Sequence, residues 1–265
     1  MLENTSNGVV YMTSPNIHTT HAFTTRFGGV SSGIFESLNL AHRTGDEPEN
    51  VKENYARLCR ALGISIDDIV CSDQVHGTYI RVATRDDRAG LFTPARHASV
   101  ASRQADGLIT QTPGVALMVF TADCVPILLH DPEKHAVGAV HAGWRGTVSD
   151  IVGVAVRTME SEFGSSPADI KAAIGPCISK CCYETDADVT DALRAALPGV
   201  YDRCFTQHGN KYMVDLKEAN RLLLAKAGLN DIVVSSECTS CSSNKYWSHR
   251  KTNGLRGSQA AVIVM

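Results

Sequence analysis

The feature that most constrains the fold is the stretch from Gly114 to Val148, with the sequence GVALMVFTADCVPILLHDPEKHAVGAVHAGWRGTV. Residues 115–120 form a continuous apolar run rich in β-branched side chains, which is typical of a strand covered on both faces. A second apolar run follows at 125–129, and another short strand is expected at 136–140. The stretch therefore predicts closely spaced buried strands, with Cys124 and His141 at bends where strands end.

A metal site is the first hypothesis for these two side chains, because folds place chemistry at such bends. His76, in the string DQVHG, is the best candidate for a third ligand. A thiolate and two imidazoles suit Zn²⁺ or copper, and three protein ligands leave one position open for water or substrate. The intervals between the three residues are too long for a zinc finger, so the fold must assemble them. Any single histidine, taken alone, is more often a surface or packing residue.

Composition limits the classes of protein to which the chain can belong. Its 265 residues show no internal repeat or linker, so one domain over 1–265 is expected. A net charge of −3 gives no electrostatic case for nucleic acid or an anionic membrane as partner. No apolar run has the length of a membrane span, and residues 1–16 lack the features of a secretory signal. Together with nine cysteines, an odd number, this predicts a cytoplasmic protein.

Helical and strand patterns alternate along the chain, which predicts the α/β class with some antiparallel pairing. The expected loop at 85–104 contains His97, which should be solvated. Helices are expected at 51–62, 147–163, 189–197 and 217–227, and the first should end at Gly63. Strands are expected near 9–12 and at 22–25, 70–71, 80–82, 170–174, 232–234 and 260–264.

Two further motifs have more than one interpretation. The loop RFGGVSSG at 26–33 is either a plain tight turn or an anion-binding loop assisted by Arg26. The strings PCISKCC at 176–182 and CTSC at 238–241 could supply a closed four-cysteine zinc site from Cys177, Cys181, Cys238 and Cys241. The three residues between Cys177 and Cys181, and the adjacent Cys182, count against that set.

The strings TADCVPILL and GAVHAGWRGTV resemble the laccase-domain family, also called multicopper polyphenol oxidase-like proteins. The resemblance covers most of the chain in order. It extends to TTRFGGVS at 24–31, SLNL at 37–40, QVHG at 74–77, ADGLIT at 105–110, IGPCI at 174–178 and DLK at 215–217. It implies one layered catalytic domain, with a mixed β-sheet core flanked by helices, similar to the cysteine-hydrolase-like fold of that family.

The resemblance also implies zinc-dependent purine nucleoside chemistry. The expected reactions are phosphorolysis of adenosine, inosine and methylthioadenosine, together with adenosine deamination. Zinc is expected on His76, Cys124 and His141, where it would activate water. The expected partners are a small nucleoside and phosphate. The residues expected to bind them are Arg26, Asn39, Gln74, Asp123 and Arg145.

Within that set, Arg145 is the first candidate for phosphate, because it stands at the expected start of a helix. Asp106 lies in a matching motif, but the resemblance gives it no defined role. The string YWSHRK at 246–251 departs from the family pattern at His249 and Lys251, so substrate specificity could differ.

There are two alternatives to this function. A metal-independent hydrolase would use Cys124 as nucleophile and His141 as base, which leaves His76 unexplained. Editing of peptidoglycan precursors would be one such hydrolytic role. Copper-dependent phenol oxidation is the other alternative, but the chain lacks the His-x-His motifs of blue-copper oxidases.

Overall fold

The computed structural model describes residues 1–41, 44–87 and 104–265. His97 and most of the expected loop at 85–104 therefore lie outside the described residues. Within the described part, the strands form two six-stranded sheets and one three-stranded sheet. No helix there is long and apolar enough to cross a membrane.

The first sheet has the strand order β1-β2-β3-β15-β7-β4. Its neighbours pair antiparallel except for β4 and β7, which are parallel. Its strands are β1 (Leu2–Ser6), β2 (Val9–Thr13), β3 (His21–Thr24), β4 (Ile69–Val70), β7 (Ala116–Thr121) and β15 (Gln259–Val264).

The second sheet has the order β14-β10-β8-β9-β6-β5, with parallel pairs at its two edges and antiparallel pairs between them. Its strands are β5 (Ile80–Val82), β6 (Gly107–Thr110), β8 (Val125–Asp131), β9 (Ala136–Ala142), β10 (Lys171–Ile174) and β14 (Asp231–Val234). The small third sheet has the order β11-β13-β12 and consists of β11 (Glu184–Thr185), β12 (Phe205–His208) and β13 (Lys211–Val214).

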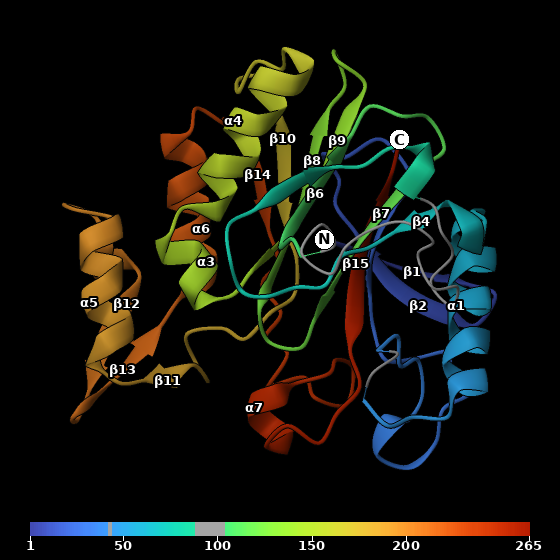
Figure 1. Ribbon diagram of the computed structural model, residues 1–265. Coiled ribbons are helices and arrows are strands. Elements are labelled where there is room, and N and C mark those ends of the chain that lie inside the picture. The colour runs from blue at the N-terminus through green and yellow to red at the C-terminus, as the bar shows by residue number, and fades with distance from the viewer. Residues whose placement is uncertain (42–43, 88–103) are drawn as a thin grey trace.

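The described α-helices are α1 (Pro48–Leu62), α3 (Trp144–Val148), α4 (Ile151–Phe163), α5 (Ala187–Ala196), α6 (Leu216–Lys226) and α7 (His249–Thr252). Helix α1 covers the outer face of the first sheet, α3, α4 and α6 cover that of the second, α5 packs against the small third sheet, and α7 lies apart from them (Figure 1). Short 3-10 turns occur at η1 (Gly33–Phe35), η2 (Ile66–Asp68), η3 (Arg85–Asp87) and η4 (Tyr201–Arg203). As predicted, α1 ends at Gly63, whose positive φ of 68° suits glycine.

Alternating side chains of the central strands divide the core into layers. On β7, Leu117 and Val119 pack toward the second sheet, whereas Ala116 and Met118 pack toward α1. On β8, Leu128 joins the layer between the sheets, and its neighbours pack beneath α4 and α6. Both faces of β7 and β8 are therefore buried, which confirms the prediction that the apolar runs are strands covered on both faces. The α/β class is confirmed as a helix–sheet–sheet–helix arrangement.

The structure differs from the sequence expectations, or adds to them, in three places. The helix expected over 147–163 is two helices, because Asp150 adopts a positive φ of 58° and its side chain caps α4 at the backbone N–H of Gly153 (3.2 Å). The strands β7 and β8, although nearly consecutive, belong to different sheets. Strand β1 and the third sheet were not expected. That the chain forms one catalytic domain stays a prediction.

Candidate metal centre

Three segments that lie far apart in the sequence meet at one end of the two large sheets. His76 lies between β4 and β5, Cys124 lies where the chain passes from β7 to β8, and His141 lies near the end of β9. Their ligand atoms all lie within 4.8 Å of one another, so the group could hold a metal ion. Cys124 Sγ is 3.9 Å from His76 Nε2, and the two imidazole rings meet edge to face with centroids 4.9 Å apart.

Asp106, directly before β6, organises two of the three candidate ligands. Its buried carboxylate accepts hydrogen bonds from the backbone N–H groups of Val75 (3.1 Å), His76 (2.9 Å) and Gly77 (2.7 Å). It also lies 2.8 Å from Nδ1 of His141. A proton on Nδ1 makes that nitrogen the donor and leaves Nε2 of His141 free to bind a metal. The same three amide contacts hold His76 at its positive φ of 62°.

Gly143 allows the cluster to form. It precedes α3, and a Cβ atom at this position would lie 2.8 Å from His76 Cδ2 and 3.4 Å from Cys124 Sγ. The first distance is shorter than real Cβ contacts allow. Any side chain here would therefore displace the His76 ring.

Cys124 and His141 each shift the pKa of the other toward its charged form. Burial raises the pKa of Cys124, but hydrogen bonds from His141 and His76 outweigh it and lower this pKa to about 6. Burial lowers the pKa of His141, but hydrogen bonds with Asp106 and Cys124 raise it to about 9. Near neutral pH the metal-free pair is therefore a thiolate beside an imidazolium. The thiolate is the form of cysteine that binds metals and attacks carbonyl groups.

Asp123 fixes the bend that carries Cys124. Its backbone has a positive φ of 89°, and its carboxylate accepts hydrogen bonds from the hydroxyls of Thr239 (2.6 Å) and Ser248 (3.1 Å). The backbone N–H of Arg250 donates to the same carboxylate (2.7 Å). These contacts tie the ligand bend to the C-terminal segment before and within α7.

Gln74 and Asn39, both expected to bind substrate, make hydrogen bonds to the protein backbone. The amide of Gln74 pairs with the backbone N–H and C=O of Phe120, at 2.7 and 2.8 Å, so the His76 loop is joined to β7. The buried Asn39 side chain accepts from the N–H groups of Ala41 (2.9 Å) and Ser258 (3.0 Å). Their roles toward a substrate stay predictions.

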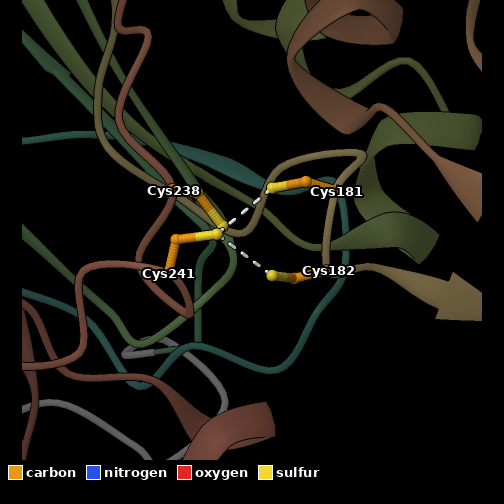
Figure 2. A group of neighbouring side chains, drawn as sticks. All are labelled: Cys181, Cys182, Cys238 and Cys241. Atoms are coloured by element: carbon orange, nitrogen blue, oxygen red, sulfur yellow. Dashed lines mark hydrogen bonds between the residues drawn. The ribbon is translucent and has the colours of Figure 1, made fainter.

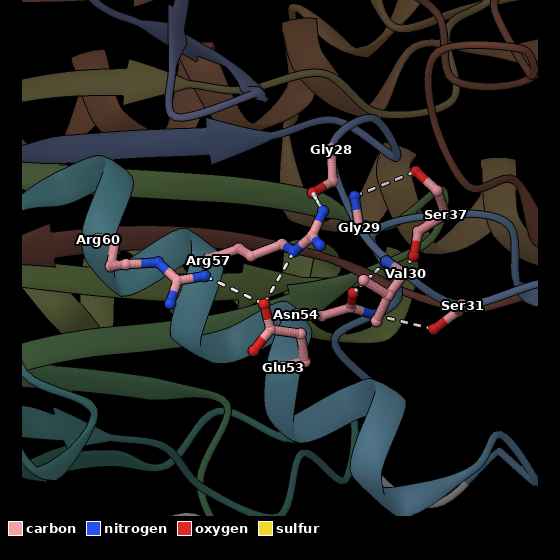
Figure 3. A network of polar contacts seen from close by, with 9 residues as sticks. All are labelled: Gly28, Gly29, Val30, Ser31, Ser37, Glu53, Asn54, Arg57 and Arg60. Carbon is pink, nitrogen blue, oxygen red and sulfur yellow. Dashed lines mark hydrogen bonds and ion pairs between the residues drawn. The ribbon is translucent and has the colours of Figure 1, made fainter.

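The glycine loop at 26–33 packs against α1 (Figure 3). The backbone N–H groups of Gly29 and Val30 donate to the side chains of Ser37 (3.2 Å) and Asn54 (2.8 Å). A Cβ atom on Gly29 would lie 2.1 Å from the carbonyl oxygen of Ser37. The close approach that these glycines permit is therefore an approach to the chain itself.

Arg26 has protein partners on several sides. Its guanidinium donates to the backbone carbonyls of Glu36 (2.7 Å from Nε) and Ser243 (2.9 Å), and it lies 4.0 Å from the ring centroid of Trp247. Burial lowers the pKa of Arg26. These contacts join the glycine loop to the C-terminal segment.

Arg145 lies in the first turn of α3 and is exposed. Its guanidinium is 4.3 Å from the ring centroid of Trp144, and within the described part of the chain it makes no ion pair. Burial and the charge of Cys124 raise the pKa of Tyr183 to about 12, while Arg250 and Arg145 act in the opposite direction. Helix α3 begins beside the cluster, because its N-cap Gly143 lies against His76 and Cys124, and Arg145 follows two residues later.

The two departures from the family pattern, His249 and Lys251, are exposed on α7. Sequence reasoning gave no role to Asp106 and did not single out Tyr183. The available signal for Asp106 was its position, an acidic residue directly before a buried strand. Nothing in the sequence around Tyr183 indicated that it would lie near Cys124.

Comparisons with known proteins agree with this geometry. A family model described as multi-copper polyphenol oxidoreductase laccase matches residues 20–265. The purine nucleoside phosphorylase YlmD of Geobacillus stearothermophilus is 41% identical over 243 residues, which are 91% of this chain and 88% of that protein. A purine nucleoside phosphorylase of Deinococcus radiodurans is 41% identical over 261 residues, which are 98% and 94% of the two chains. The crystal structure of the Geobacillus YlmD has a TM-score of 0.90 at 37% identity, covering 98% of this chain and 97% of that one.

Proposed function

Because the chain belongs to the multi-copper polyphenol oxidoreductase laccase family, we propose that it is a zinc-dependent purine nucleoside phosphorylase. The observation that carries the proposal is the convergence of His76, Cys124 and His141 around one point, with Asp106 behind them. The names of relatives that match most of the chain support the reaction type. The expected substrates are adenosine, inosine and methylthioadenosine with phosphate, and adenosine deamination is a second reaction proposed for the same site.

The donor set fits zinc. One thiolate and two imidazoles are ordinary zinc ligands, and bonds of about 2.3 Å to sulfur and 2.0–2.1 Å to nitrogen put those atoms about 3.6 Å apart in a tetrahedral site. The 3.9 Å between Cys124 Sγ and His76 Nε2 is close to that value. The contact from Asp106 to His141 is the carboxylate–histidine arrangement that orients zinc ligands.

Each neighbouring residue then has a defined task. A bound zinc ion would supply Lewis-acid chemistry at its open coordination position. Asp106 holds two ligands in place, and Gly143 leaves room for them. Arg145 offers a positive charge that no carboxylate of the described residues neutralises, which suits a phosphate. Trp144, beside it, presents an aromatic ring on which a purine could stack.

A second candidate function has a specific observation in its favour. Cys124, His141 and Asp106 stand in the order nucleophile, base and orienting carboxylate, and the Cys124 pKa of about 6 gives a thiolate at neutral pH. A metal-independent cysteine hydrolase, such as one that edits peptidoglycan precursors, would use this arrangement. It gives no task to His76.

The test is a nucleoside panel with and without phosphate, run on zinc-loaded and chelator-treated protein. We expect phosphate-dependent release of purine that chelation abolishes and added zinc restores. His76→Ala should lose at least about 100-fold in kcat/KM, because only the zinc mechanism uses that side chain. Metal analysis of the purified protein separates zinc from copper.

His18→Ala is the matched control, because His18 is an exposed histidine that is not part of the cluster. It should retain full activity. Turnover that survives chelation and the loss of His76, but stops on alkylation of Cys124, would favour the cysteine hydrolase. Phenol oxidation with bound copper and no nucleoside turnover would contradict both candidates.

A further inference from the structure

A second cluster of metal-binding side chains is formed by Cys181, Cys182, Cys238 and Cys241, and none of them belongs to the centre described above (Figure 2). Their four sulfur atoms lie within 4.8 Å of one another. Cys241 Sγ is 3.4 Å from the sulfur of Cys181 and 3.3 Å from that of Cys182. We propose that these cysteines bind a second, structural zinc ion.

The sulfur–sulfur distances fit a metal better than a disulfide. Zinc–sulfur bonds of about 2.3 Å place the sulfurs of a tetrahedral four-cysteine site about 3.8 Å apart. The observed separations, from 3.3 to at most 4.8 Å, lie around that value. A disulfide bond measures about 2.05 Å and joins only two sulfurs. Here all four converge.

Backbone hydrogen bonds around Cys238 hold the turn that carries two of the proposed ligands. The backbone N–H of Ser179 donates to Cys238 Sγ (3.3 Å), so the sulfur accepts a hydrogen bond from the opposite loop. Two backbone contacts bring the loops together. One is an isolated parallel β-bridge between the main chains at Cys177 and Cys238, and the other is the hydrogen bond from Thr239 N–H to the carbonyl of Cys177 (3.1 Å). The carbonyl of Cys238 accepts from Ser242 N–H (2.9 Å), which closes the turn that carries Cys241.

Cys182, rather than Cys177, completes the set. The sequence suggested Cys177 because it begins the first cysteine string, but its side chain is fully buried and donates to the carbonyl of Ile178 (3.3 Å). Cys181 and Cys182 are adjacent, yet both reach Cys241. The chain therefore supplies two ligands from each of two loops.

Nearby cations suit the charge of the proposed site. Four thiolates and Zn²⁺ carry a net charge of about −2. The Lys217 ammonium donates to the carbonyl of Glu237 (2.6 Å) and to Ser179 Oγ (2.8 Å), so it joins the same two loops. The Arg250 guanidinium donates to the carbonyl of Cys182 (3.3 Å). Both cations would stabilise an anionic cluster beside them.

The role of this zinc would be structural, because four protein thiolates leave no open coordination position. It would link the segment between β10 and β11 to the segment between β14 and α7. Thr239 lies inside the second segment, and its hydroxyl donates to Asp123, next to Cys124. The second ion would therefore stabilise the bend at Cys124 through the contact between Thr239 and Asp123. The proposal does not rest on the proposed function, because it uses no residue of the first centre.

The test counts metal in the full-length protein, purified under reducing conditions from zinc-supplemented cells. We expect about two zinc ions per chain in the unaltered protein and about one in either Cys241→Ser or Cys124→Ser. Cys71→Ser, a partly buried cysteine outside both clusters, is the control and should keep both ions. A zinc content of about one that Cys241→Ser leaves unchanged would overturn the proposal.

Two measurements guard against a variant that fails to fold. Cobalt loaded into the His76→Ala protein should give the intense thiolate-to-metal absorption of a tetrathiolate site, and Cys181→Ser should remove it. Alkylation and mass analysis of the unaltered, non-reduced protein should find all four thiols without a disulfide. A disulfide within the set, or cobalt absorption that Cys181→Ser leaves intact, would contradict a four-cysteine metal site.

Discussion

Asp106 is completely buried, yet its carboxylate makes four hydrogen bonds, three to the His76 loop and one to His141. These contacts lower its pKa in spite of the burial, which alone would raise it. The candidate ligands themselves could be found in the sequence, because cysteine and histidine at strand ends carry a chemical signature. The carboxylate behind them could not, since its role depends on a contact between residues far apart in the chain.

Asp106→Asn should weaken zinc binding by about 10- to 100-fold, because the amide nitrogen faces backbone donors and the partner of His141 is lost. A competition titration with a chelator measures this affinity. Asp131→Asn is the control, since Asp131 is equally buried and also accepts two backbone N–H groups, from Glu133 and Lys134. Equal losses of affinity in both variants would show that the effect of Asp106 is general destabilisation.

Cys124 predicts a pH dependence in the metal-free protein. Its folded pKa of about 6 lies below the ordinary value, so the thiolate contributes stability at high pH that is lost as the pH falls through 6. The alkylation rate of Cys124 should therefore have a midpoint near pH 6, compared with about 8.5 for an unperturbed cysteine. Asp106→Asn should raise this midpoint, because His141 would hold its proton less tightly. An unshifted midpoint in the unaltered protein would contradict the ion pair.

Arg145 should matter more for phosphorolysis than for deamination, because only phosphorolysis uses an anion. We expect Arg145→Ala to lower phosphorolysis by about 10- to 100-fold, or roughly 1.4 to 2.7 kcal/mol of transition-state stabilisation. Arg145→Lys should recover part of the rate. Arg60→Ala, which removes an exposed arginine from α1, should have no effect. If both reactions fall equally while the zinc content is unchanged, Arg145 does not serve phosphate specifically.

Among the elements, α1 was predictable because its signals are local: a proline in the first turn, apolar residues at helical spacing and a glycine cap. The break between α3 and α4 also has a local cause, the capping side chain of Asp150, but the apolar spacing continues across it and favoured one helix. The break between the helices also affects the candidate metal centre. Helix α3 is a separate short element whose N-cap, Gly143, packs directly on His76.

Gly143→Ala tests that packing. The added Cβ atom would lie 2.8 Å from His76 Cδ2, so the ring must move away from the metal position. Overpacking of this kind costs about 1–3 kcal/mol, and it would destabilise the zinc-bound state rather than the metal-free state. We therefore expect zinc affinity to drop by about 5- to 150-fold, measured by chelator competition. The metal-free protein should unfold almost as before, because His76 is exposed and can turn aside. Unchanged affinity would mean that the ring has room to adjust.

For the molecule as a whole, the sequence predicted the class and most strands but not how the strands divide between sheets. The apolar runs of β7 and β8 look alike, and only long-range pairing sends β7 to β15 and β8 to β9 and β10. The third sheet was missed because β11 has only two residues and β12 is largely exposed. This division also positions the candidate metal centre, since Cys124 lies where the chain crosses from one sheet to the other.

The first metal centre should therefore act as a cross-link between the two large sheets. Zinc at about 1,000 times its dissociation constant would stabilise the folded state by about 4 kcal/mol. For a chain of this length, each kcal/mol raises Tm by about 2–4 °C, so a single site should raise Tm by roughly 8–16 °C. Calorimetry of chelator-treated and zinc-loaded protein measures the shift. The two clusters share no ligand. His76→Ala should therefore remove the contribution of the first site to the Tm shift, Cys241→Ser that of the second site, and the double variant the whole shift. A Tm that zinc does not raise would contradict metal binding at either cluster.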